Sequence, residues 1–143
     1  MRGATIAGIA FSNASVALVH GMSRPLGANF HVPHGLSNAM LLPAVTAFSI
    51  SGAPDRYARI SRHIGFSQSE NDQTACQDLV EGLRKLNRSL EIPSLQGYGV
   101  NTEQFEKVIS KMAKDALASG SPSFNPRVPT EEQIVDLYHQ AYA

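Results

Sequence analysis

The first 55 residues of the chain carry only three charged side chains, Arg2, Arg24 and Asp55, and this scarcity constrains the fold most. The whole chain of 143 residues holds 12 Lys and Arg and 12 Asp and Glu, so the remaining charges lie in residues 56–143. A small domain exposes much of its surface to water, and charged side chains dominate such surfaces. The length suits one domain, 1–143, but residues 1–55 are expected to need cover from other protein.

The overall composition excludes several classes of protein. The net charge is zero, which argues against electrostatic recruitment to nucleic acid or to an anionic membrane. The single cysteine, Cys76, excludes an internal disulfide framework and a Cys-x-x-Cys site, and it fits a reducing, cytoplasmic location. Because the first residues carry one arginine and no run of 18 apolar residues follows, we expect neither a signal peptide nor a membrane-spanning helix.

The charge-poor half predicts two apolar helices separated by a loop. Residues 5–22 are apolar nearly all round, as in a buried helix, and one face is formed by Ile6, Ile9, Asn13, Val16 and His20. Two prolines and a glycine in residues 23–33 predict a loop, and 49–54 a second break. A second apolar helix is expected over 36–48, kinked or tightened by Pro43.

The charged half predicts four more helices, over 55–64, 71–89, 101–117 and 130–141. Gly65 closes the first, and Asn101 with Gln104 and Thr130 with Gln133 are cap signals for the last two. The inward side chains are expected to be Ala75, Leu79, Gly82, Leu83, Leu86, Phe105, Val108, Ile109, Met112, Leu117, Ile134, Leu137, Tyr138 and Ala141. The predicted fold is therefore all-α, a bundle of about six helices without a sheet.

Three of the five histidines, His20, His31 and His34, lie within fifteen residues around the predicted loop. Imidazole is the commonest metal ligand and the usual acid–base group, and the loop could turn both His20 and His34 into one space. The competing interpretation is that each is a hydrogen-bonded core residue, and the residues alone leave both open. His63 and His139 are expected to be solvated or structural.

Two histidines do not complete a metal site, because zinc and ferrous sites take at least three protein ligands, commonly with a carboxylate. The only acidic residue before position 70 is Asp55, which follows a loop and a whole helix. Any missing ligands are therefore expected to come from elsewhere.

Four runs of residues stand out in the charge-poor half: Ala-Gly-Ile-Ala-Phe-Ser-Asn-Ala (7–14), Leu-Val-His-Gly-Met (18–22), Pro-Leu-Gly-Ala (25–28) and Phe-His-Val-Pro-His-Gly-Leu-Ser-Asn-Ala (30–39). In this order they closely resemble iron-containing (group III) alcohol dehydrogenases. The resemblance covers the whole chain but only the C-terminal part of the family, and it includes Leu86-Asn87, Ile92-Pro93 and Asn125-Pro126-Arg127 with Thr130.

The resemblance implies a two-domain enzyme that shares its fold with dehydroquinate synthases and glycerol dehydrogenases. An N-terminal α/β domain would bind NAD or NADP, and the C-terminal helical domain would hold a divalent metal, Fe2+ or alternatively Zn2+. The family's ligands are one Asp and three His, of which two match His20 and His34. The other two belong to an Asp-x-x-x-His helix, which is expected before Met1.

Arg24 departs from the family, because many members have histidine at this position. Arginine stays protonated at ordinary pH and cannot be a general base. Three roles remain open for Arg24: binding an anionic group of a substrate, binding a cofactor phosphate, or capping the last carbonyls of the preceding helix. The resemblance places His31 beside the ligands rather than among them.

The leading functional prediction is the metal-binding part of an NAD(P)-dependent enzyme that interconverts a small alcohol and an aldehyde or ketone. One alternative is a metal-independent enzyme resembling maleylacetate reductase, which Arg24 would suit. Another is a truncated helical fragment that is catalytically inactive, as we expect of residues 1–143 alone. The expected partners are a small substrate and further copies of the protein, and neither nucleic acid nor a membrane.

Overall fold

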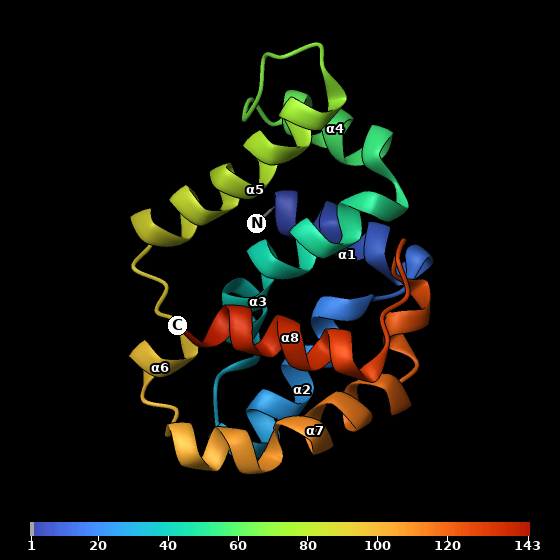
Figure 1. Cartoon of the computed structure of the whole chain (residues 1–143). Helices are drawn as coiled ribbons and strands as arrows, with labels where there is room; N and C mark the ends of the chain where they lie inside the picture. The colour runs from blue at the N-terminus through green and yellow to red at the C-terminus, as the bar shows by residue number, and fades with distance from the viewer. Residues whose placement is uncertain (1) are drawn as a thin grey trace.

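The computed structural model describes residues 2–143, and within this range helices are the only regular secondary structure, without a strand (Figure 1). The prediction of an all-α fold is confirmed, although the described residues form eight α-helices rather than about six. Their bounds, with two short 3-10 helices, are α1 Arg2–Ala14, α2 Leu18–Phe30, α3 His34–Ser49, η1 Ile50–Gly52, α4 Pro54–His63, α5 Asp72–Ser89, α6 Leu95–Tyr98, α7 Thr102–Ala118, η2 Ser121–Phe124 and α8 Glu131–Tyr142.

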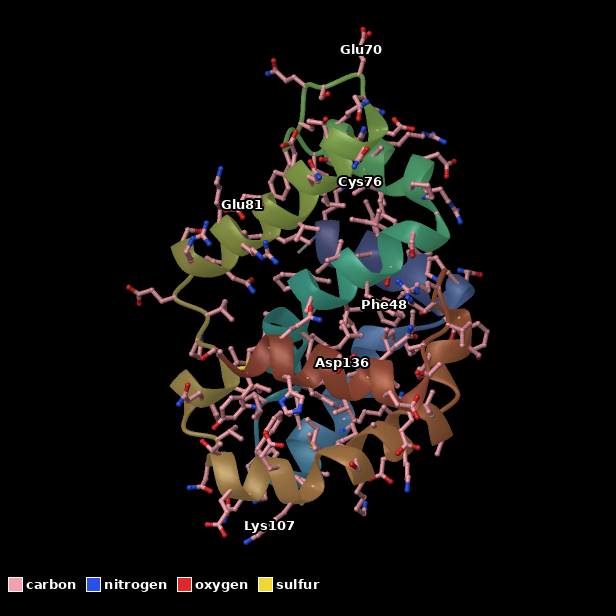
Figure 2. All side chains as sticks on the ribbon, viewed as in Figure 1. Phe48, Glu70, Cys76, Glu81, Lys107 and Asp136 are labelled. Carbon is pink, nitrogen blue, oxygen red and sulfur yellow. The ribbon has the colours of Figure 1, made fainter. Side chains whose placement is uncertain are left out.

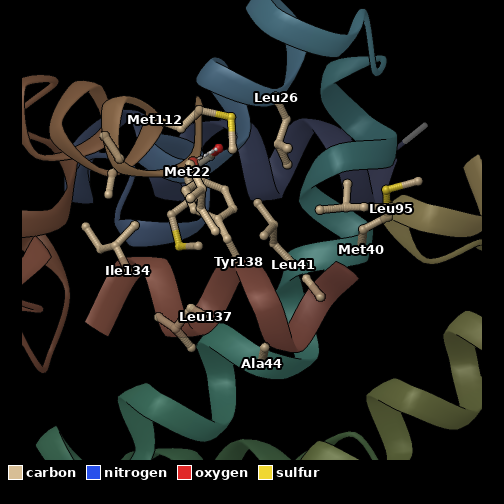
Figure 3. Packing of buried hydrophobic residues seen from close by; sticks show 14 of the residues in the cluster. Met22, Leu26, Met40, Leu41, Ala44, Leu95, Met112, Ile134, Leu137 and Tyr138 are labelled. Carbon is tan, nitrogen blue, oxygen red and sulfur yellow. Dashed lines mark hydrogen bonds between the residues drawn. The ribbon is translucent and has the colours of Figure 1, made fainter. Parts of the chain in front are cut away.

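The main core lies between α2, α3, α7 and α8, whose apolar stripes meet in one cluster (Figure 3). Helix α8 contributes Ile134, Leu137, Tyr138 and Ala141 to this cluster, and all four are buried, as predicted. The hydroxyl of Tyr138 donates a hydrogen bond of 2.7 Å to the carbonyl of Met22 in α2. Burial raises the pKa of Tyr138, so its hydroxyl stays a neutral donor.

A smaller cluster joins α4 to α5, where Ala58, Ala75 and Cys76 are buried together. These two helices lie at one end of the molecule, away from α7 (Figure 1). Charged side chains such as Glu70 and Glu81 at this end, and Lys107 on α7, point outward (Figure 2). The charged half of the sequence therefore supplies the solvated surface, as its composition indicates.

The prediction of one helix over 5–22 is wrong, because the chain turns between α1 and α2. Ser15 has a positive φ of 69° and Ala17 is extended, so α2 begins at Leu18. The face that would join Ile6 to His20 does not exist. Helix α1 also has no buried residue, and Ile6 is 59% exposed. Its apolar side chains lack cover from the described residues, so the expectation that residues 1–55 need other protein holds for α1. It is wrong for α2 and α3, whose apolar faces are buried by the other helices of this chain.

The loop predicted over 23–33 is also wrong, because α2 continues through Pro25 to Phe30. Leu18, Met22 and Leu26 lie one turn apart on α2 and are all fully buried. Each such burial stabilises a fold by about 2 kcal/mol, whereas an interior proline costs about 3 kcal/mol. The packing of one helical face therefore outweighs the proline, and only residues 31–33 separate α2 from α3.

Helix α3 contains Pro43, as predicted, and a distant side chain compensates for the hydrogen bond that proline removes. Proline has no N–H to donate to the carbonyl four residues earlier, here Ala39. The side-chain amide of Asn87 in α5 donates to that carbonyl instead, over 2.7 Å. Pro43 therefore fixes where α5 packs against α3.

The predicted caps are confirmed. The side chain of Asn101 accepts a hydrogen bond from the backbone N–H of Gln104 at the start of α7. Thr130 and Gln133 form a complete capping box at the start of α8. Gly65 follows α4 with a positive φ of 79°, the conformation that favours glycine after a helix.

No single helix of residues 2–143 has both the length and the apolar composition to cross a membrane. Helices α1 and α2 reach these limits only together, and they are bent by 103° relative to each other.

Replacing Tyr138 by Phe should lower the free energy of unfolding by about 1 kcal/mol, because it removes the buried donor to the Met22 carbonyl. Urea denaturation measures the change. Tyr98→Phe is the matched control, since Tyr98 is 40% exposed. Equal effects of the two substitutions would contradict the role given to the buried hydrogen bond.

Candidate metal centre

His20 and His34 lie side by side, with their ring centres 5.2 Å apart and their planes at 58°. His20 is in the first turn of α2, and His34 is the first residue of α3. The short segment between the helices runs back along α2 (Figure 1). A Cβ on Gly27 would lie only 3.5 Å from the carbonyl oxygen of Val32, which shows how closely this segment follows the helix.

The predicted convergence of His20 and His34 is therefore present, but its cause differs. The chain turns after Phe30 and not over 23–33, and His31 ends α2 with a positive φ of 55°. Its backbone N–H bonds to the carbonyl of Gly27, as in a left-handed helix cap.

The separation of the two rings fits a shared metal ion. With a metal–nitrogen distance of about 2.1 Å and a tetrahedral angle, the centres of two imidazoles that bind one ion lie about 5 Å apart. The observed 5.2 Å meets this requirement. His20 is half-buried and His34 is exposed, so the pair faces the outside of the described part of the chain.

Hydrogen bonds define the tautomer of His34. Ser23 Oγ donates to the carbonyl of His20 over 3.2 Å and lies 3.2 Å from His34 Nδ1. The side-chain amide nitrogen of Asn38, which can only donate, lies 3.2 Å from His34 Nε2. Both contacts are satisfied when Nδ1 carries the proton and the lone pair of Nε2 accepts from Asn38. Nε2 can bind a metal in this tautomer once the Asn38 amide gives up its contact.

Two further observations suit a site that takes a ligand. Burial lowers the pKa of His20, and the neighbouring His34 and Arg24 lower it further, which favours the neutral ring that metals bind. The side-chain oxygen of Asn38 is buried and has no hydrogen-bond partner among the described residues. Such an unsatisfied buried acceptor is uncommon, and it lies on α3 one helical turn after His34.

Arg24 lies one helical turn after His20, on the same side of α2. The interpretation of Arg24 as a helix cap is wrong, because α2 continues for six residues beyond it. Its side chain is exposed, and no hydrogen bond or ion pair joins it to another residue in 2–143.

The other three histidines do not join the pair. His31 is exposed and lines a separate hollow of about 230 Å³ with Tyr98 and Asn101, so the structure does not place it beside the ligands. His63 is exposed, and His139 lies 3.5 Å from Glu106 on the surface, as expected for solvated residues.

Within residues 2–143, no group of three or more His, Cys, Asp or Glu side chains could hold a metal ion. The described residues therefore offer two ligands, which is fewer than a divalent transition metal takes from protein. Sequence reasoning missed Ser23 and Asn38, although their spacings of three from His20 and four from His34 would have placed them on the same helix faces.

Comparison with known proteins decides the family. The sequence model described as "Fe-containing alcohol dehydrogenase family, C-terminal" matches residues 1–142. The chain belongs to the iron-containing alcohol dehydrogenase family. Its helical fold is that of the family's C-terminal domain: it superposes on the iron-containing alcohol dehydrogenase of Thermococcus thioreducens with a TM-score of 0.84, 39% identity and 97% coverage of this chain. For a 1,3-propanediol oxidoreductase structure, the TM-score is 0.88 with 32% identity over 95% of this chain.

The names of two relatives state an activity. Lactaldehyde reductase of Escherichia coli is 38% identical over 98% of this chain, and the NADPH-dependent butanol dehydrogenase of Clostridium saccharobutylicum is 30% identical over 96%. The chain spans about a third of the length of these relatives: 36% of the lactaldehyde reductase, 35% of the butanol dehydrogenase and 35% of each of the two solved structures.

Residues 1–143 should bind Co2+ or Zn2+ weakly, with His20 and His34 both required. Ser23→Ala should weaken binding about tenfold, because it frees the ring of His34 to rotate. Isothermal titration with each ion measures the affinity. Ser12→Ala is the matched control, since the Ser12 hydroxyl bonds only within α1. Unchanged affinity in His20→Ala or His34→Ala would contradict a shared ion.

Proposed function

We propose that this chain is the metal-binding part of an NAD(P)-dependent dehydrogenase that interconverts an alcohol and an aldehyde or ketone. In the oxidative direction, the alcohol loses a hydride to NAD(P)+ and a proton to solvent, which gives the carbonyl compound and NAD(P)H. The observation that carries the proposal is the His20–His34 pair, with ring centres 5.2 Å apart in a chain of this family.

His20 and His34 would hold a divalent ion, Fe2+ or alternatively Zn2+, together with ligands from outside residues 2–143. When bound, such an ion supplies Lewis-acid polarisation of the substrate oxygen and so lowers the pKa of the alcohol. The residues of this chain prepare the site. Burial lowers the pKa of His20 and so favours the neutral ring, and the contact of Ser23 Oγ with Nδ1 restrains the ring of His34.

NAD or NADP would bind mainly to the part of the protein that this chain does not include. The name of one relative, the NADPH-dependent butanol dehydrogenase, supports a nicotinamide cofactor. Residues 1–143 alone are therefore expected to be inactive. The exposed apolar side chains of α1 support association with other protein, including further copies, and the single cysteine supports a cytoplasmic location.

The full-length polypeptide that contains residues 1–143 should reduce NAD+ or NADP+ in the presence of an alcohol, and removal of its metal should abolish the activity. Absorbance at the nicotinamide band measures the rate after chelation and after readdition of Fe2+ or Zn2+. His20→Ala and His34→Ala should each lower kcat/KM at least about a hundredfold, since each removes an ion ligand.

His63→Ala is the matched control, because His63 is exposed on α4, and it should retain full activity. Activity that survives complete chelation would overturn the metal-dependent mechanism and favour the metal-independent alternative.

A further inference from the structure

Arg24 presents a positive charge on the same side of α2 as His20, and no residue in 2–143 forms an ion pair with it. No acidic residue occurs before Asp55 in the sequence, and among residues 2–143 no hydrogen bond or ion pair reaches the Arg24 side chain. Arg24 nevertheless lies one helical turn after His20 on α2, and residues four apart on a helix are neighbours on its surface. An arginine placed here is therefore part of the surroundings of the pair, and not a remote surface residue.

This charge opposes the binding of a cation. A fixed positive charge near a divalent-cation site weakens the affinity for the ion. Arginine cannot reduce this repulsion by losing its proton, because its guanidinium stays charged at ordinary pH. The capping role that would explain Arg24 structurally is excluded, since α2 continues to Phe30. An anionic group that lies against the guanidinium would offset this repulsion.

We propose that Arg24 binds the carboxylate or phosphate of a substrate whose hydroxyl or carbonyl oxygen lies at the His20–His34 pair. The substrate class is then a short hydroxy or oxo compound with an anionic group, and not a neutral alkanol. The guanidinium can hold a carboxylate or phosphate through two parallel hydrogen bonds, which also fixes the direction of the substrate relative to the two rings. This inference rests on the proposed dehydrogenase function.

A phosphate of the cofactor is the other anionic group that the Arg24 guanidinium can bind. The two possibilities predict different effects when the guanidinium is removed. If the guanidinium binds the substrate, its loss raises KM only for anionic substrates. If it binds a cofactor phosphate, its loss lowers the affinity for NAD+ or NADP+ and affects all substrates alike.

The test compares wild type, Arg24→Gln and Arg24→Lys in the full-length polypeptide. Each is assayed with two pairs of substrates in which the hydroxy acid and the diol have the same number of carbons. The pairs are lactate with propane-1,2-diol, and 4-hydroxybutyrate with butane-1,4-diol. Arg24→Gln should raise KM for the preferred hydroxy acid about tenfold or more, with kcat and the values for the diol little changed. Arg24→Lys should restore part of the loss, because it keeps the charge but not the bidentate geometry. Arg59→Gln on α4 is the matched control, since Arg59 is also exposed and unpaired among the described residues.

A binding measurement that needs no turnover accompanies the kinetics. Isothermal titration of the metal-free polypeptide with propanoate and with methylphosphonate should show binding of one of them in wild type and in Arg59→Gln, and its loss in Arg24→Gln. Titration with NAD+ and NADP+ should give the same affinities for all variants.

Three results would overturn the proposal. In Arg24→Gln, activity toward hydroxy acids and toward diols could fall equally, or cofactor affinity could fall without a change in KM for hydroxy acids. The third result is anion binding that does not depend on Arg24. Failure of the proposed function has a different signature. A polypeptide without dehydrogenase activity that still binds the probe anion through Arg24 would refute the function and retain the anion site.

Discussion

The burial of one face of α2 is the constraint on which the rest of this structure depends. Leu18, Met22 and Leu26 are fully buried against α3, α7 and α8, and Tyr138 of α8 adds a hydrogen bond to the carbonyl of Met22. This packing keeps α2 helical through Pro25 and sets its rotation about its own axis. With that rotation set, Ser23 faces the start of α3 and contacts His34, and His20 comes to lie beside it. The candidate metal centre is thus a consequence of the core.

Local patterns predicted much of the fold, and they failed where the decisive contact is distant in sequence. The buried residues of α8 and the caps at Asn101 and Thr130 follow from spacing within one helix, which the sequence displays directly. The turn at Ser15–Ala17 contains neither glycine nor proline, so nothing local marked it. Pro25 indicated a loop because its cost is local, whereas the burial that outweighs the cost comes from other helices.

The candidate site shows the same division. The charge-poor setting and the spacing around a turn predicted that His20 and His34 would converge, and the structure places their rings 5.2 Å apart. The contacts of Ser23 and Asn38 with His34 depend on how closely the segment 31–33 follows α2, which no pattern of residue types expresses. The interpretation of Arg24 as a cap failed for a related reason, since it assumed a helix end that the core packing removes.

The central claim is that His20 and His34 bind the same ion. A crystal structure of the metal-loaded full-length polypeptide, with anomalous scattering recorded at the metal absorption edge, tests it most directly. The account predicts one anomalous peak about 2.0–2.2 Å from a ring nitrogen of each histidine, with Ser23 still bonded to His34 Nδ1. A peak bound to only one of the two rings, or one elsewhere in the protein with both rings free, would contradict it.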